Sequence, residues 1–167
     1  MLSRREFGQL ALGAAEAALL LPVADTVAAQ TPARNRSLIG GVQFGLQPFC
    51  YHDLAMTRDN RSELIRRLVR NEMGMVELHA TWVEPRSNAP GVTNVAARDQ
   101  LREWRLATPA SYDQAVRREL DAAGVEVFTY YITFDDSFTD TEIDAVFQGA
   151  KVLGARGCVG SMGLAVS

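Results

Sequence analysis

The 167-residue sequence contains very little lysine and cysteine. Lys151 is the only lysine among 17 basic residues, and it lies in an amphipathic helical pattern, so Schiff-base chemistry on a lysine is disfavoured. The two cysteines, Cys50 and Cys158, match no metal or redox motif, and we expect core residues, with a disulfide as the alternative. The sequence also lacks a nucleophile elbow, a phosphate-binding glycine loop and a Cys/His cluster, which disfavours the enzyme classes that depend on them.

An excess of basic charge and long apolar runs are missing as well. The formal net charge is −3, which argues against a nucleic-acid partner. The apolar stretch from Leu10 to Val23 is interrupted by Glu16 and Pro22, and it falls short of the roughly 20 residues that span a bilayer. No second apolar segment follows, so we expect no stable membrane anchor.

The N-terminus has the layout of a twin-arginine (Tat) export signal. Residues 3–7 read SRREF, and the moderately apolar stretch follows them. Val27 and Ala29 occupy the small-residue positions before a cleavage site at Gln30. We therefore predict a signal peptide over residues 1–29, a linker over 30–39 and a periplasmic or secreted domain over 40–167; the alternative for the first segment is an amphipathic helix.

Strand and helix signals alternate along the rest of the chain. Alternating or β-branched segments predict strands over residues 41–47, 75–80, 125–133 and 157–162. Apolar residues at helical spacing predict helices between them, and each of these patterns ends at a glycine. The last helix is expected to begin at Thr139, with Glu142 completing a capping box. This alternation is typical of βα units that build a parallel sheet.

Residues 81–107 interrupt this alternation of strands and helices, because βα connections usually take about 2–6 residues. Residues 94–105 within this insertion have the pattern of a short additional helix. Long insertions at the carboxyl ends of strands often shape substrate pockets, so we expect such a role here.

Four segments carry a family resemblance: GVQFGLQPF, MGMVELHA, LREWRLATPASYDQAVRRELDAAGVEVFTYYITF and FTDTEIDAVFQGAKVLGARGC. In this order and spacing they resemble the xylose-isomerase-like TIM-barrel superfamily, which comprises sugar (phosphate) isomerases and epimerases and metal-dependent apurinic endonucleases. The resemblance implies an α/β fold, a TIM-type (β/α) barrel. A full barrel needs eight βα units and about 250 residues. We therefore expect residues 40–167 to form only about the first four units, an N-terminal half.

The resemblance also implies a chemistry. Such enzymes isomerise sugars at a carbonyl with a divalent metal, for which Mn²⁺, Mg²⁺, Co²⁺ or Zn²⁺ is expected in the full-length protein. The family's principal metal ligands lie on later strands, so this chain is expected to lack them, and its metal residues stay unknown. The alternative is a non-catalytic carbohydrate-binding or degenerate barrel fragment. A phosphodiesterase is disfavoured by the export signal and the acidic charge.

Glu77 and His79 are the candidate catalytic residues. Alternation along the strand turns Val76 and Leu78 toward the helices and turns Glu77 and His79 toward the barrel interior, near the strand's carboxyl end. A carboxylate and an imidazole two residues apart can bind a metal, orient a hydroxyl or exchange a proton. The alternative is that they fill a polar interior through mutual hydrogen bonds.

Gln47, His52, Trp82 and Tyr131 are the candidate substrate-binding residues. Gln47 and His52 follow the first predicted strand on the catalytic side, and an ordinary loop role is the alternative for His52. Trp82 could stack on a sugar ring or anchor the insertion, and Tyr131 could reach substrate or pack. The expected ligand is a small carbohydrate, and the open edges of a half-barrel predict a homo-oligomer or aggregation.

Overall fold

The computed structural model describes residues 37–85 and 94–160. The predicted signal peptide, most of the predicted linker, part of the insertion and the end of the last predicted strand lie outside the described residues. No helix within the described part of the chain is long and apolar enough to cross a membrane.

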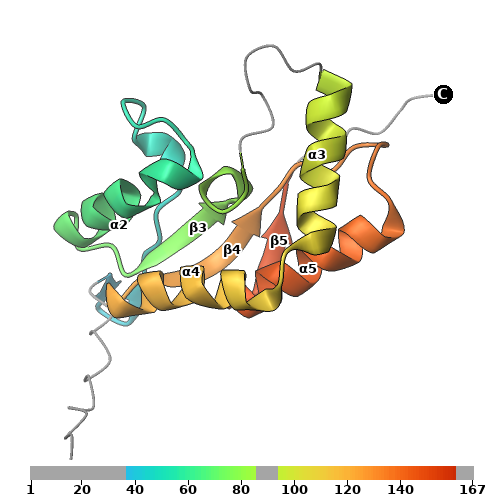
Figure 1. The fold of residues 1–167 in the computed structure, drawn as a ribbon. Helices are drawn as coiled ribbons and strands as arrows, with labels where there is room; N and C mark the ends of the chain where they lie inside the picture. Colours follow the sequence, from blue (N-terminus) through green and yellow to red (C-terminus); the bar gives the residue numbers. More distant parts are fainter. Residues whose placement is uncertain (1–36, 86–93, 161–167) are drawn as a thin grey trace, which may run out of the picture. The chain divides into compact units, whose positions relative to one another are not determined.

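Within the described residues, three parallel strands form the main sheet. They are β3 (Met75–His79), β4 (Glu126–Tyr131) and β5 (Gly157–Val159), and they lie side by side in chain order (Figure 1). Helix α4 (Ala110–Ala122) precedes β4, and helix α5 (Asp140–Leu153) connects β4 to β5. The fold is therefore mixed α/β with a parallel sheet built from successive strand–helix units.

The first predicted strand, over residues 41–47, is wrong in extent. β1 (Leu38–Ile39) and β2 (Val42–Gln43) instead form a small antiparallel hairpin. Its turn contains Gly40 and Gly41, whose φ angles of 58° and 82° suit glycine. Only Leu46 joins the parallel sheet, through a bridge to Val76.

The pairing with β3 is limited to Leu46 for a local reason. Its backbone N donates to the carbonyl oxygen of Met75, and its carbonyl accepts from the backbone N of Glu77, both at 3.0 Å. The 3₁₀ turn η1 (Pro48–Cys50) begins two residues later, and Pro48 has no N–H to extend a ladder. The contact nevertheless places Leu46 beside β3, where a first strand would lie.

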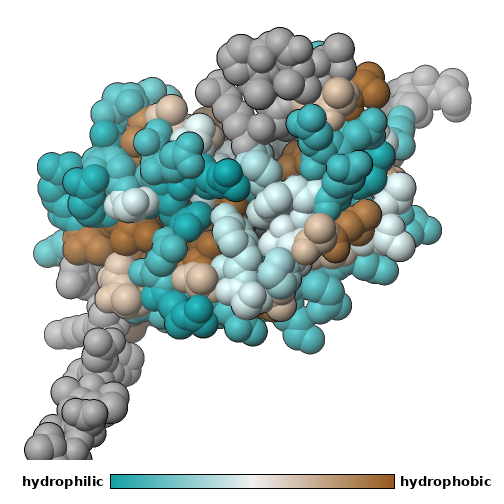
Figure 2. Space-filling view, in the orientation of Figure 1, coloured by the Kyte–Doolittle hydropathy of each residue, from teal (hydrophilic) through white to brown (hydrophobic). Residues whose placement is uncertain are grey.

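Three helices cover one face of the sheet. Helix α2 (Arg61–Arg70) follows the 3₁₀ turn η2 (Arg58–Asn60), and it packs with α4 and α5 against the buried strand side chains. One cluster of buried residues joins these elements: Leu64, Leu68, Val76, Leu78, Val116, Leu120, Val127, Tyr130, Val146, Ala150 and Leu153. In the view of Figure 2, hydrophilic residues cover most of the surface and apolar residues gather in separate small areas.

The two cysteines do not pair. Cys50 is exposed in η1, which corrects its expected place in the core, whereas Cys158 is half-buried and packs against the core. The expected disulfide alternative is therefore not formed in this structure.

A β-bulge in β4 sets which residues share a face. Val76 lies opposite Val127, but Glu77 lies opposite Thr129, so Phe128 is an extra residue without a partner across the ladder. From Thr129 onward the two strands are again in step.

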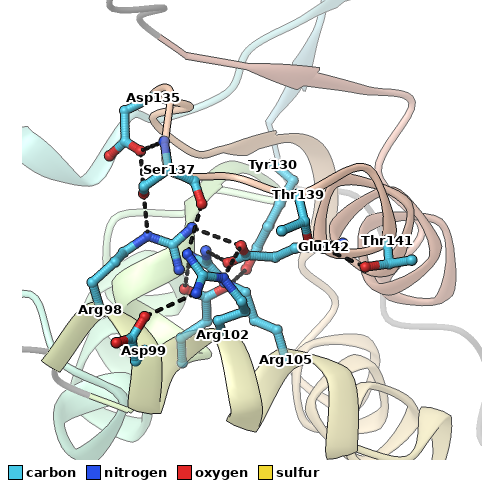
Figure 3. Close-up of polar contacts among 11 residues, drawn as sticks. Arg98, Asp99, Arg102, Arg105, Tyr130, Asp135, Ser137, Thr139, Thr141 and Glu142 are labelled. Carbon is cyan, nitrogen blue, oxygen red and sulfur yellow. Dashed lines mark hydrogen bonds and ion pairs between the residues drawn. The ribbon is translucent and has the colours of Figure 1, made fainter. Parts of the chain in front are cut away.

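The insertion contains the predicted helix, as α3 (Asn94–Ala107). Three arginines of α3 point toward Glu142 near the start of α5 (Figure 3). Arg98 and Arg105 donate to the Glu142 carboxylate at 2.6 and 2.7 Å, and Arg102 lies at 3.4 Å. Arg105 also binds Glu84, which follows the 3₁₀ turn η3 (Ala80–Trp82), with two hydrogen bonds of 2.9 and 2.6 Å. These ion pairs attach α3 to α5.

Glu142 is fully buried in this cluster. Burial alone would raise its pKa, but the hydrogen bonds from Arg98 and Arg105 outweigh burial and hold the pKa below its usual value. The predicted capping box is only half formed, because Thr139 accepts from the backbone N of Glu142 at 3.3 Å while the Glu142 side chain binds the arginines. The Glu142 carboxylate therefore binds side chains of another helix and does not cap its own helix.

Candidate functional site on the uncovered face of the sheet

The strands present a second, less buried face opposite the core. Val76 and Leu78 are completely buried, whereas Glu77 and His79 are only half-buried. The predicted alternation along β3 is thus confirmed. We call the face that carries Glu77 and His79 the uncovered face, because α2, α4 and α5 pack on the other side.

His79 is held by two aromatic rings. Its ring stacks on Tyr131, with centroids 4.5 Å apart and planes inclined by 19°. Phe49 of η1 meets the same imidazole edge-on at 5.9 Å. The register of β3 and β4 puts His79 directly opposite Tyr131, which explains the stacking. Three rings from separate elements therefore gather at the carboxyl ends of two parallel strands.

The contacts of His79 also favour one tautomer. Its Nδ1 lies 3.0 Å from the Thr81 hydroxyl and accepts a long bond of 3.4 Å from the backbone N of Thr81. An Nδ1 that accepts from the backbone leaves the proton of the neutral ring on Nε2. Burial lowers the pKa of His79, opposed by the charge of Glu77, so the imidazole is neutral at pH 7 and Nε2–H is its hydrogen-bond donor.

Glu77 lies beside a shallow open cavity of about 270 Å³. Thr129, its partner across the ladder, donates to its carboxylate at 3.1 Å. Gly45, Gln47 and Phe128 also line this cavity. The carboxylate therefore keeps accepting capacity for a ligand hydroxyl.

Of the other predicted site residues, only some lie near Glu77 and His79. Gln47 lines the cavity of Glu77, although its side-chain oxygen also caps η1 by accepting from the backbone N of Phe49 at 3.2 Å. His52 is exposed in the turn after η1, and within the described residues no hydrogen bond or ring contact joins it to Glu77 or His79. Trp82 is 0 % exposed in the core, so it is not accessible for stacking on a sugar, and its position agrees with the anchoring alternative.

Sequence reasoning did not single out Phe49, Thr81 or Thr129. Thr129 was detectable, because it lies two residues before Tyr131 and shares its face by simple alternation. The positions of Phe49 and Thr81 depend on 3₁₀ turns after the strands, for which periodicity gives no signal.

The described residues do not by themselves fit the metal that the resemblance implies. Catalytic zinc sites, for comparison, use three protein ligands. Among residues 37–85 and 94–160, no three His, Cys, Asp or Glu side chains lie close enough together to hold an ion. Glu77 and His79 supply two donors, so we derive no chemical step through a metal.

Comparisons with known proteins found no match. No family model matches the chain, and neither a curated protein nor a solved structure does. The resemblance to xylose-isomerase-like barrels therefore stays a prediction, and the residues of the uncovered face are the basis for a functional proposal.

Proposed function

We propose that the domain over residues 40–167 is the N-terminal half of a TIM-type barrel of the sugar isomerase/epimerase kind, and that its uncovered face binds a carbohydrate. The parallel strands in chain order, with helices on one face, support this proposal, since successive βα units of a barrel have this arrangement. The uncovered face corresponds in the proposal to the barrel interior.

One observation carries the proposal: His79 stacks on Tyr131 at the carboxyl ends of β3 and β4, and Glu77 lies on the same face two residues before His79. Active sites of parallel barrels occur at this end of the strands. The rings of Tyr131 and Phe49 offer apolar surface for the C–H face of a sugar, and the carboxylate accepts from its hydroxyls.

These groups also suit proton movement next to a carbonyl. The Glu77 carboxylate would remove a proton from the carbon beside the sugar carbonyl, and His79 Nε2–H would donate to the carbonyl oxygen. In the family that the chain resembles, a divalent metal acts as Lewis acid on the same oxygen. We do not assign metal ligands to residues of this chain.

A second candidate is a carbohydrate-binding domain without catalysis. The engagement of His79 Nδ1 with Thr81 and of the Glu77 carboxylate with Thr129 favours it, because both groups already serve local contacts. Such a domain would hold a sugar through the same face and leave it unchanged.

The two candidates are separated by binding and exchange experiments on one protein. D-xylose and D-glucose are titrated by NMR against the chain and against Glu77→Gln, His79→Asn and, as control, the exposed His52→Asn. We expect Glu77→Gln and His79→Asn to weaken binding by about tenfold, the value of a charge-assisted hydrogen bond, and His52→Asn to leave it unchanged. Absence of saturable binding would overturn both candidates.

Catalysis is then measured as the incorporation of solvent deuterium at the sugar carbon next to the carbonyl, with and without added Mn²⁺. The isomerase proposal expects exchange that Glu77→Gln abolishes. Binding without exchange in either condition would contradict the isomerase and favour the binding domain.

We further propose export by the Tat pathway, which the SRREF arrangement at residues 3–7 supports. Changing Arg4 and Arg5 together to lysine should leave the precursor uncleaved in the cytoplasm, as measured by fractionation and mass spectrometry. Normal cleavage and periplasmic accumulation of this variant would contradict the assignment.

A further inference from the structure

A second cavity lies on the side of the sheet that the helices cover. It has a volume of about 180 Å³ and is bounded by α3, α4, α5 and the segment after η3. Trp104 and Val152 contribute apolar walls, whereas Glu84, Asp113 and Tyr130 contribute polar groups. Tyr130 and its neighbour Tyr131 point to opposite faces of β4, so this cavity is separate from the carbohydrate site proposed above.

The two acidic side chains of the cavity, Glu84 and Asp113, differ in whether a basic side chain neutralises their charge. Glu84 receives two hydrogen bonds from Arg105, which also binds Glu142. Within the described part of the chain, the Asp113 carboxylate accepts no hydrogen bond and forms no ion pair. Among the described residues, Arg105 is the only basic one that lines the cavity, and its charge is already shared between two carboxylates. Within this part of the chain, the Asp113 carboxylate is therefore the one acidic group of the cavity without a basic partner.

Asp113 lies against α5 on the wall of the cavity. A Cβ on Gly149 would lie only 3.2 Å from an Asp113 carboxylate oxygen, so the carboxylate packs this closely because residue 149 has no side chain, and both residues line the cavity. Burial and the charge of Glu84 raise the pKa of Asp113, as expected for a carboxylate without a cationic partner.

We propose that this cavity binds a small organic cation, a primary ammonium on a compact apolar body, with the ammonium against Asp113 and the body against Trp104 and Val152. An anion would meet Asp113 and Glu84, and among the described lining residues the one cation, Arg105, is already bound to two carboxylates. A neutral ligand would leave the Asp113 charge uncompensated, whereas an ammonium supplies both the charge and the hydrogen-bond donors that it lacks. Cavities of about 150 Å³ accommodate a benzene-sized molecule, so a six-membered ring suits the volume.

The test compares cyclohexylammonium with cyclohexanol, which has nearly the same shape and no charge. Calorimetry in phosphate buffer with the full chain should show saturable binding of the cation, and binding of the alcohol weaker by about tenfold or more. No saturable binding of the cation, or equal binding of the alcohol, would overturn the proposal.

Variants locate the binding on the structure. Asp113→Asn should weaken binding of the cation by about tenfold or more, because it keeps the shape and removes the charge. Asp121→Asn is the matched control, since Asp121 lies on the same helix and its carboxylate is exposed beside Arg117. Gly149→Val should also weaken binding by filling the cavity. Undiminished binding to both Asp113→Asn and Gly149→Val would show that the cation binds elsewhere.

Discussion

The two faces of the sheet use the same strands for different purposes. On the covered face, Val76, Leu78 and Tyr130 are buried against helices, and close packing there provides stability. On the uncovered face, Glu77 and His79 alternate with those residues and remain accessible. The difference shows that a strand can carry a candidate site at every second position without weakening the core.

The covered side also contains charge. Apolar contacts join α2, α4 and α5 to the sheet, whereas α3 is attached to α5 mainly by the arginines around Glu142. The following changes probe each part of this contrast, beginning with the largest expected effect.

The largest loss of stability is expected from Glu142→Ala. Removing one partner of a buried ion pair leaves uncompensated charges and costs about 3–5 kcal/mol of the free energy of unfolding. The control is Glu126→Ala, whose pair with Arg156 is exposed and long at 3.8 Å, and which should cost at most about 1 kcal/mol. Urea unfolding measures both, and equal losses would contradict a structural role for the buried cluster.

Leu78→Ala tests the apolar part of the covered face. Truncating a completely buried leucine costs about 2–5 kcal/mol. Glu77→Ala, the neighbouring change on the uncovered face, should cost less than about 1 kcal/mol, since it removes one half-buried hydrogen bond to Thr129. If Glu77→Ala destabilised the fold as much as Leu78→Ala, the two faces would not differ as described.

The uncovered face also contains exposed apolar side chains, Phe128 and Val159 among them. The sheet ends at β5 on one side and at Leu46 on the other, with no further strand paired within the described residues. We propose that a second copy pairs with these edges about a two-fold axis, so that β5 of one copy meets the Leu46 segment of the other in parallel.

Light scattering on the purified chain tests this pairing. We expect a dimer, and we expect Phe128→Asp with Val159→Asp to shift it to monomer. Val95→Asp is the control, because Val95 is exposed on α3. A monodisperse monomer of the unchanged chain with a cooperative melt would contradict the dimer and favour a self-contained small α/β fold.

The smallest effect is expected from Asp113→Asn, and it has the opposite sign. The pKa of Asp113 is raised in the folded protein, so its ionised form opposes folding at neutral pH and this penalty disappears as pH falls through the folded pKa. The variant should therefore melt at a higher temperature at pH 7 and show no gain at pH 3. A gain of the same size at both pH values would refute an electrostatic origin.

Much of this architecture was predictable from local sequence patterns. The periodicity of residues 94–105 and the alternation of residues 75–80 predicted α3 and the two faces of β3, because each depends on neighbours in the chain. The hairpin at Leu38–Gln43 was not predicted, since the positive φ angles of Gly40 and Gly41 override the apparent alternation.

The candidate site was predictable only in part. Alternation placed Glu77 and His79 on one face, but the stacking of His79 on Tyr131 depends on the register between two strands. Glu142 similarly has the sequence position of a helix cap, and Arg98, one of its actual partners, lies 44 residues earlier. Contacts between distant segments have no local sequence signal.

The bulge at Phe128 has a consequence for changes in chain length. Phe128 is the residue that interrupts the ladder, and Val127 and Thr129 already point to opposite faces. Deleting Phe128 would therefore leave Val127 in the core and Thr129 beside Glu77, whereas deleting a paired residue of β4 would exchange the two faces. We therefore expect β4 to tolerate the loss of this one residue with the two faces of the sheet unchanged.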